Sequence, residues 1–343
     1  GYHIMRELRQ DAVFTYLDSR ALKMRRDGQE QSFLVQYATI PTVADLLTLH
    51  DIKLQHELPA EEPSPQFPEL EQALAAAHDA REGAMAYARW CDRYLRIPPK
   101  KLKQMCFAGV TEALSLTEGS LYTGDELYQR ILMELRAARC CASERIEDIK
   151  QFVQRSIPFP QDPSISAVAE AMRAAFAIDG ESFEPDEVVS RVKHTSEIKR
   201  VKHLVKYLDG SWLEHWTLAA FLANKQLCRL HNFALSLQSH QQEARLKLEF
   251  DVAAMQGYQL HAVSCTRDAD KELCKSKLFE VFIRATQIGG DEASSALVCA
   301  YDKPGALQSE VAELWRVSSN RMRVFGAGDL AELPERFATW LQI

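Results

Sequence analysis

The stretch LKLEFDVAAMQGYQLHAVSCT, residues 246–266, decides the fold of the last third of this chain. It indicates two strands: one from Leu246 to Met255 that carries Asp251 near its middle, and a second from Tyr258 to Cys265. A turn at Gln256-Gly257 between two apolar runs is typical of a β-hairpin. We therefore predict an antiparallel hairpin that holds a carboxylate rigidly on a buried strand.

The segments around this hairpin alternate between helical and strand patterns. Alternation of this kind predicts an α/β layer, in which helices cover a sheet. Gly289-Gly290 supplies the stop signal for the helix that follows the hairpin. We predict helices over 211–225, 271–288, 311–318 and 330–342, and strands over 230–237, 295–301 and 322–325.

The rest of the chain predicts two further units. Residues 1–57 give a helix (1–10), strands (13–18 and 32–37) around a charged loop, and a helix capped by Thr42, which together suggest part of a Rossmann-like segment. Residues 58–208 follow a Pro- and Glu-rich linker and are mainly helical, and residues 209–343 form the α/β domain. Within the middle unit we predict helices over 69–95, 124–154, 164–177 and a basic helix over 185–208.

Composition narrows the classes of function. The formal net charge is -7, so contact with a polyanion requires a local basic patch and not the whole surface. The sequence shows no secretion signal and no apolar run long enough for a membrane span, so we expect a cytoplasmic protein without membrane contact. The eight cysteines include no C-x-x-C pair, which favours free thiols in a reducing compartment over a zinc site.

Carboxylates from separate elements predict a metal site. Asp251 and Glu249 share one face of their strand, Glu214 lies in the first turn of a helix, and the backbone carbonyl of Cys265 lies on the neighbouring strand. Mg²⁺ and Mn²⁺ prefer such oxygen ligands, and such an ion can activate water for phosphodiester hydrolysis. Two plainer roles remain open: Asp251 as a turn cap, and Glu214 as an acid that interacts with the helix dipole.

Cationic side chains supply candidates for phosphate contacts. Lys275 or Lys277 would approach the scissile phosphate as a catalytic lysine, and Arg284 would bind a neighbouring phosphate. Lys199, Arg200 and Lys202, in the basic run 191–206, could follow a nucleic-acid backbone. The alternative is that both sets form ordinary solvated helix faces. A cysteine hydrolase built on Cys265 and His261 lacks a third partner in the sequence.

These residues, in this order, resemble a known family. The runs Gly210-Ser-Trp-Leu-Glu214, Glu249-Phe-Asp251, Val263-Ser-Cys-Thr266 and Lys275-Ser-Lys277 are similar to the C-terminal PD-(D/E)XK nuclease domain of CRISPR ancillary effectors, in which the nuclease follows a CARF sensor domain. The resemblance implies a homodimer that cleaves DNA or RNA with Mg²⁺ or Mn²⁺, and a cyclic oligoadenylate activator if the complete sensor is present.

The sequence differs from the family motif at two positions. Ser264 stands where the family has its second strand acid, and Thr266 stands where it has its lysine. Serine is a poor metal ligand and threonine carries no charge. Either Glu249 and a lysine of the next helix replace them, or the domain is a catalytically inactive nuclease fold that serves as a nucleic-acid-binding or structural subunit of a defence complex.

Overall fold

The computed structural model describes residues 41–54, 62–95, 156–239, 248–316 and 321–342, together with the backbone of three short strands near the N-terminus. The helices predicted over 1–10 and 124–154 lie outside the described residues. Within the described part, no helix is both long and apolar enough to cross a membrane.

A five-stranded mixed sheet forms the centre of the C-terminal domain, in the order β10-β9-β8-β7-β6. The predicted hairpin is confirmed, because β7 and β8 pair antiparallel with Gln256 opposite Gln259. Strands β8, β9 and β10 run parallel, so helices must connect them across the faces of the sheet. The strands are β6 (Leu230–Gln238), β7 (Glu249–Gln256), β8 (Gln259–Thr266), β9 (Ser294–Cys299) and β10 (Met322–Phe325).

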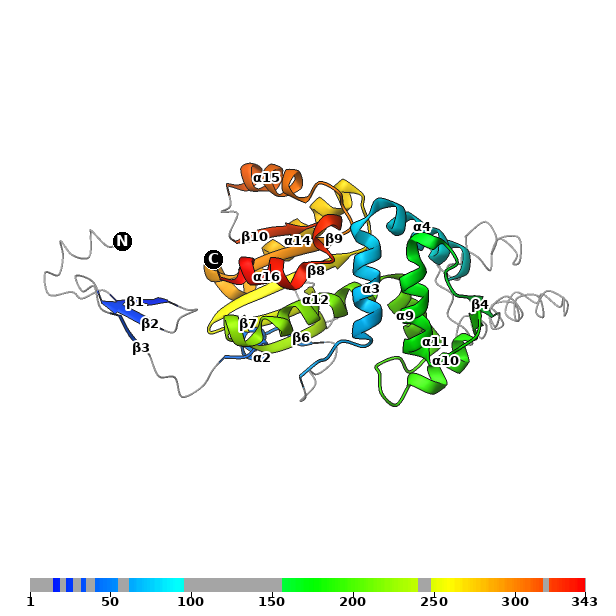
Figure 1. The fold of residues 1–343 in the computed structure, drawn as a ribbon. Coiled ribbons are helices and arrows are strands. Elements are labelled where there is room, and N and C mark those ends of the chain that lie inside the picture. Colours follow the sequence, from blue (N-terminus) through cyan, green and yellow to red (C-terminus); the bar gives the residue numbers. More distant parts are fainter. Residues whose placement is uncertain are drawn as a thin grey trace, which may run out of the picture.

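Helices cover both faces of this sheet, as Figure 1 shows. One core forms beneath α12 (Trp212–Ala223) and α16 (Leu333–Leu341), where Trp212 is fully buried. The other forms beneath α14 (Lys271–Gly289) and α15 (Pro304–Trp315). The prediction for α15 began too late, because Pro304 occupies the first turn, where a proline costs no backbone hydrogen bond. Short elements complete the domain: α13 (Lys225–Cys228), η3 (Gly290–Glu292) and η4 (Ala327–Asp329).

The described part of the middle unit is helical, and two of its predicted helices are broken. The helix predicted over 69–95 is two helices, α3 (Pro68–Asp79) and α4 (Arg81–Tyr94), because Ala80 between them has an extended backbone. The basic helix predicted over 185–208 is likewise divided into α10 (Pro185–Val192) and α11 (Val201–Lys206). The remaining elements are η1 (Pro163–Ile165), α9 (Ser166–Phe176) and a two-residue pair, β4 (Ile157–Pro158) with β5 (Ser182–Phe183).

A π-helical segment, η2 (Tyr207–Ser211), joins the middle unit to the sheet domain. Gly210 interrupts it with an extended φ of 177°, and α12 then begins at Trp212. Helix α3 packs between α12 on one side and α9 on the other, as Figure 1 shows. Tyr87 on α4 adds a specific bond, since its hydroxyl donates to the carbonyl of Leu208 at 2.6 Å. The helical unit therefore packs directly against the start of the helix that carries Glu214.

The short helix α2 (Val43–Leu49) packs on the sheet domain. Thr42 caps it, as predicted, and forms a reciprocal capping box with Asp45. Val43 and Leu47 are buried in the core beneath α14, and the Val43 amide donates to Asn232 on β6 at 2.7 Å. Residues 42–49, which we assigned to the N-terminal segment, therefore contribute to the core of the C-terminal domain.

The described N-terminal strands form a small antiparallel sheet in the order β1-β2-β3. They are β1 (Thr15–Asp18), β2 (Lys23–Arg26) and β3 (Ser32–Leu34). The prediction of a charged loop over 23–28 was wrong for residues 23–26, because β2 pairs with a strand on each side. Backbone pairing does not require apolar side chains, so the charged residues of β2 gave no strand pattern in the sequence. The Rossmann-like segment stays a prediction.

Candidate nuclease site

Asp251 lies where the ladder between β7 and β8 ends. The last regular pair on that side is Val252 with Val263, so the next donors on β8 are free to meet a side chain. The amide of Cys265 donates to Asp251 Oδ2 at 2.6 Å, and the Ser264 hydroxyl donates to the same oxygen at 3.0 Å. Asp251 is therefore held from the neighbouring strand, as the hairpin predicted.

Glu214 reaches the same region from the first turn of α12. The Ser236 hydroxyl donates to Glu214 Oε2 at 2.7 Å. Ser236 itself has a left-handed backbone, with φ of 50°, beyond the register shift of β6, which lies between His231 and Ala234. Burial, and to a smaller extent the negative charge of Asp251, raise the pKa of Glu214 to about 7. The structure thus brings these two predicted acids into one electrostatic site.

A small cavity of about 20 Å³ opens beside Asp251. This volume suits a single water molecule or a bare ion. We call it the acidic cavity. It is lined by Glu249, Asp251, Ser264, Lys277, Glu280 and Val281.

Asp251 experiences opposing influences in this cavity. Burial raises its pKa, and the charge of Glu249 adds to the rise. The Cys265 amide, the Lys277 ammonium and the Ser264 hydroxyl lower the pKa. Lys277 is therefore close enough to lower the pKa of Asp251, although Lys277 lies on α14 and not on β8, where the family motif has its lysine.

The two candidate lysines of α14 differ in their surroundings. Lys275 Nζ is 2.7 Å from Glu310 Oε1 on α15, and Lys271 contacts the other oxygen of that carboxylate at 2.6 Å. Lys277 instead lines the acidic cavity. Residues two apart on a helix face in different directions, so both lysines cannot reach one site. The structure pairs Lys275 with Glu310 and places Lys277 at the acidic cavity, and the role of either lysine at the scissile phosphate stays a prediction.

The donor set fits a hard divalent cation, with fewer carboxylates than we predicted. Within the described ranges, no group of three or more His, Cys, Asp or Glu residues is placed to hold a metal ion. Glu249 lines the acidic cavity but accepts a bond from Gln238 at 3.2 Å. Mg²⁺ is commonly bound through one or two carboxylates and several waters, so the pair Glu214 and Asp251 is enough to anchor one.

The thiol and the backbone of Cys265 make separate contacts. The thiol is 3.4 Å from the Thr217 hydroxyl, and burial raises its pKa well above the usual value. A buried thiol of this kind is a poor nucleophile, which argues against a cysteine hydrolase. The backbone of Cys265, through its amide, faces Asp251. In a strand the N–H and C=O of one residue point to the same side, so its carbonyl faces that side too.

The residues predicted to contact nucleic acid lie on α14 and around the start of α11. Arg284, one turn beyond Glu280 on α14, donates to Gln287 at 3.0 Å. Lys199 lies in the break between α10 and α11, where its ammonium donates to the carbonyls of Lys193 and Ser196 at 2.6 and 2.7 Å. Arg200 precedes the first residue of α11. The basic run is therefore a bent segment, and its role in nucleic-acid binding stays a prediction.

Comparison with known proteins identifies the domain that contains this site. Residues 201–343 match the family model described as "Card1-like, endonuclease domain". The C-terminal part of this chain is therefore similar to Card1-like endonuclease domains. No curated protein sequence matches the chain.

Two solved structures resemble the whole chain. Can2 from Sulfobacillus thermosulfidooxidans, solved in complex with cyclic tetra-adenylate, matches with a TM-score of 0.51 and 10% identity over 96% of this chain and 68% of that one. Protein VC1899 from Vibrio cholerae matches with a TM-score of 0.49 and 16% identity over 99% of this chain and 71% of that one. The likeness to Can2 concerns the fold alone. The predicted α/β class and nuclease-like C-terminal domain are confirmed.

Sequence reasoning missed two features of the endonuclease site. Ser236, which holds Glu214, lies in a strand whose alternation gave no hint of a left-handed residue. Glu280 was noticed only as part of a polar stripe, yet it lines the acidic cavity with Lys277, which precedes it by three residues on α14. Spacing of three residues on a helix could have indicated that pairing.

Proposed function

We propose that this protein is a metal-dependent endonuclease of a prokaryotic, CRISPR-type defence system that cleaves phosphodiester bonds in DNA or RNA. The observation that carries the proposal is the convergence of Glu214 and Asp251, two half-buried acids from different elements, whose charges repel each other. A cation between them would relieve that repulsion. The match of residues 201–343 to an endonuclease domain supports the same chemistry.

The chain's own groups have distinct roles in this proposal. Glu214, Asp251 and the Cys265 carbonyl would hold Mg²⁺ or Mn²⁺, and Glu249 would orient water in its outer shell. The ion, when bound, activates water and neutralises charge on the phosphate. Ser264 and the Cys265 amide fix the rotamer of Asp251 through their bonds to Oδ2. Lys277, from α14, would place its ammonium against the phosphate oxygen that gains charge during cleavage.

A second function rests on the substitutions at Ser264 and Thr266. If neither Lys277 nor Glu249 replaces the missing motif residues, the domain binds nucleic acid without cutting it. Such a protein would act as a binding or structural subunit of a defence complex. The cavity beside Asp251, lined by Lys277 and Glu249, favours the enzyme, because it brings a cation and a further carboxylate to the acid that Glu214 faces.

One assay separates the two functions. Purified protein is incubated with labelled single-stranded and duplex DNA and RNA, with Mn²⁺, with Mg²⁺ or with EDTA. We expect cleavage that requires the metal and disappears in Asp251→Asn, while binding of the substrate persists. Binding without cleavage in every metal and substrate combination would establish the non-catalytic function instead.

Regulation and assembly are extensions of the same proposal. Can2 was solved with cyclic tetra-adenylate, and we infer that a cyclic oligoadenylate also activates this protein if its sensor domain is complete. We further propose a homodimer in the cytoplasm. Cleavage rates measured with and without added cyclic oligoadenylates, and molar mass by light scattering, test these points directly.

A further inference from the structure

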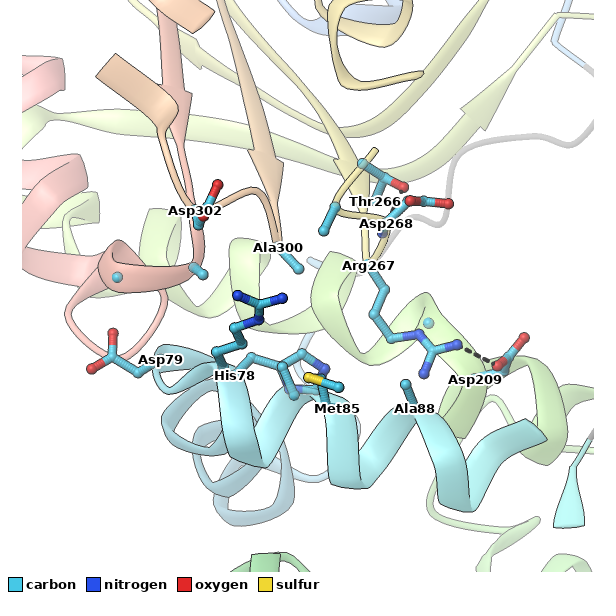
Figure 2. Close-up of a pocket in the computed structure, with 16 residues that line it drawn as sticks. His78, Asp79, Met85, Ala88, Asp209, Thr266, Arg267, Asp268, Ala300 and Asp302 are labelled. Atoms are coloured by element: carbon cyan, nitrogen blue, oxygen red, sulfur yellow. Dashed lines mark hydrogen bonds and ion pairs between the residues drawn. The ribbon is translucent and has the colours of Figure 1, made fainter. Parts of the chain in front are cut away.

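A large pocket adjoins the candidate nuclease site and has no part in the chemistry described so far. Its volume is about 1070 Å³, at the upper end of the sizes typical of small-molecule sites. One wall is α4, and the others are the segments that follow β8, β9 and β10, as Figure 2 shows. We call it the α4 pocket.

The α4 pocket is continuous along the chain with the nuclease site. Thr266 and Arg267 line it and directly follow Cys265, whose amide holds Asp251. Gly210 also lines it and lies one helical turn before Glu214. Arg267 follows Ser264 by three residues, about 10 Å of extended chain. The lining of the α4 pocket therefore begins one residue after the strand segment that holds Asp251.

The walls of the α4 pocket are shaped for a flat, neutral ring. Helix α4 presents Ala84, Met85 and Ala88, and alanines at 269, 300 and 327 line the other segments. Figure 2 shows Met85 and Ala88 on α4 beneath the opening. Met85 keeps 49% of its surface exposed, which is unusual for a large apolar side chain. Small side chains on opposed walls leave a slot, and a thioether makes favourable contacts with aromatic rings.

Arg267 is fixed in the wall of the α4 pocket. Its Nη2 atom donates to Asp209 Oδ1 at 2.9 Å, and both side chains are nearly buried, with 12% and 13% exposed. Its Nη1 atom is buried as well, so the guanidinium is part of a rigid wall and is not a free donor. Figure 2 shows the bond to Asp209.

The charges of the α4 pocket select against a phosphate. Arg267 is neutralised by Asp209, which leaves Arg81 to face Asp79, Asp268 and Asp302. The lining therefore carries a net negative charge, which repels anions and tolerates a neutral heterocycle. His78 adds no positive charge, since burial lowers its pKa to about 4.

We propose that the α4 pocket is a subsite for one nucleobase of the substrate strand, the base adjacent to the phosphate at the nuclease site. Met85 and the alanines contact the faces of the base, and Arg267, held in place by Asp209, forms the wall beside it. This inference rests on the proposed nuclease function, because it assigns the flanking nucleotide of that substrate.

A block of the α4 pocket tests the inference. Gly328 lines the pocket, and a Cβ added there would meet no atom within 4 Å, so Gly328→Trp fills the slot without a backbone clash. Gly305→Trp is the matched control, because Gly305 is equally unobstructed and lies outside the pocket lining. The substrate is one labelled oligonucleotide with a mapped cut, prepared with an abasic nucleotide at each position around that cut.

We expect one flanking position at which loss of the base lowers kcat/KM about tenfold, as for loss of one base-stacking contact. Gly328→Trp should lower kcat/KM for the intact oligonucleotide by the same factor of about ten. In this variant, an abasic nucleotide at that flanking position should cause no further loss. Gly305→Trp should give the wild-type kcat/KM for both oligonucleotides. Equal rates for all abasic oligonucleotides, or equal behaviour of the two tryptophan variants, would overturn the subsite.

Binding measurements separate failure of the subsite from failure of the nuclease function. Fluorescence anisotropy with Asp251→Asn gives Kd for the same oligonucleotides without cleavage. If the wild type does not cut, the subsite still requires weaker binding of one abasic oligonucleotide and of the variant Gly328→Trp. Unchanged Kd values overturn it. Met85→Asp, with Leu227→Asp as its exposed control, repeats the test without a bulky residue; the first should weaken binding and the second should not.

Discussion

Glu71 in the helical unit and Glu214 in the endonuclease domain both have a pKa raised to about 7, mainly by burial, but their neighbours differ. Glu71 is fully buried and Glu214 is half-buried. Glu71 Oε1 accepts from the amides of Gln66 and Phe67 and from the Tyr207 hydroxyl, each at 3.0 Å. Glu214 accepts from the hydroxyls of Ser236 and Ser211 and faces the charges of Asp251 and Lys206.

This difference separates a structural acid from a functional one. Glu71 Oε1 gathers donors that would otherwise be unsatisfied at the start of α3, whereas Oε2 has no partner among the described residues. Glu214 faces a second acid, and Lys206 offsets that repulsion only in part, so a bound cation would stabilise both carboxylates. A perturbed pKa alone does not indicate function; the identity of the neighbouring groups does. Each prediction below tests this contrast or the charges around it.

The largest expected effect concerns Lys277. Lys277→Ala should lower kcat by about a hundredfold or more, because it removes the cation nearest Asp251 and the developing charge. Lys275→Ala is the matched control and should change kcat by less than about threefold, since its charge is bound by Glu310. Single-turnover cleavage rates with saturating Mn²⁺ provide the measurement. Equal rates for the two variants would remove Lys277 from the mechanism.

Metal binding should stabilise the wild-type protein and distinguish the two glutamates. Mn²⁺ at about a hundred times its Kd should add about 2.7 kcal/mol to the free energy of unfolding. Glu214→Gln should abolish this gain, because it removes an anionic ligand, while Glu71→Gln should retain it. Thermal unfolding of each protein, with EDTA and then with Mn²⁺, gives the comparison. A gain that survives in Glu214→Gln would place the ion elsewhere.

The two glutamates should also affect metal-free stability in opposite directions at pH 8. The pKa of Glu214 is about 7 in the folded protein and 4.5 in the unfolded chain. As pH rises, the unfolded chain therefore loses this proton before the folded protein does. Stability from this group is therefore lost as pH rises from about 4.5 to 7, by up to about 3 kcal/mol. Glu214→Gln should remove that loss and stabilise the apo protein at pH 8.

Glu71→Ala should instead destabilise the protein by about 2 kcal/mol, because it leaves the donors of Gln66, Phe67 and Tyr207 without their acceptor. Urea unfolding in EDTA at pH 5 and pH 8 measures both effects. If Glu214→Gln destabilised the protein as much as Glu71→Ala, the distinction between a structural and a functional acid would be lost.

The smallest effect should come from the basic segment. Substituting Lys199, Arg200 and Lys202 together with alanine should reduce the slope of log Kobs against log salt by no more than about 2, although three charges are lost. The reason is that the Lys199 ammonium already donates to the carbonyls of Lys193 and Ser196, beyond the end of α10, which holds it away from a phosphate. Titrations of labelled nucleic acid between low and high salt test this, and an unchanged slope would remove the segment from the interface.

Local pattern was sufficient to predict most of the endonuclease fold. Alternation and the Gln256-Gly257 turn predicted β7 and β8, and the Gly289-Gly290 pair predicted the end of α14. Pattern failed where a residue's backbone departed from its neighbours without a Gly or Pro to mark it. Ala80 divides α3 from α4, and Ser236 bends β6, although neither residue type is a usual signal for such a change.

The sequence by itself determined which acids were available and that Asp251 would be rigid, because a strand in a buried hairpin leaves its side chains little freedom. Only the tertiary structure decided that Glu214 meets Asp251, that Lys277 serves the acidic cavity while Lys275 binds Glu310, and that an empty slot lies beside them. The physical reason is that these relations depend on how α12, α14 and α4 pack against the ends of the strands, and packing between distant segments leaves no periodic signal in the chain.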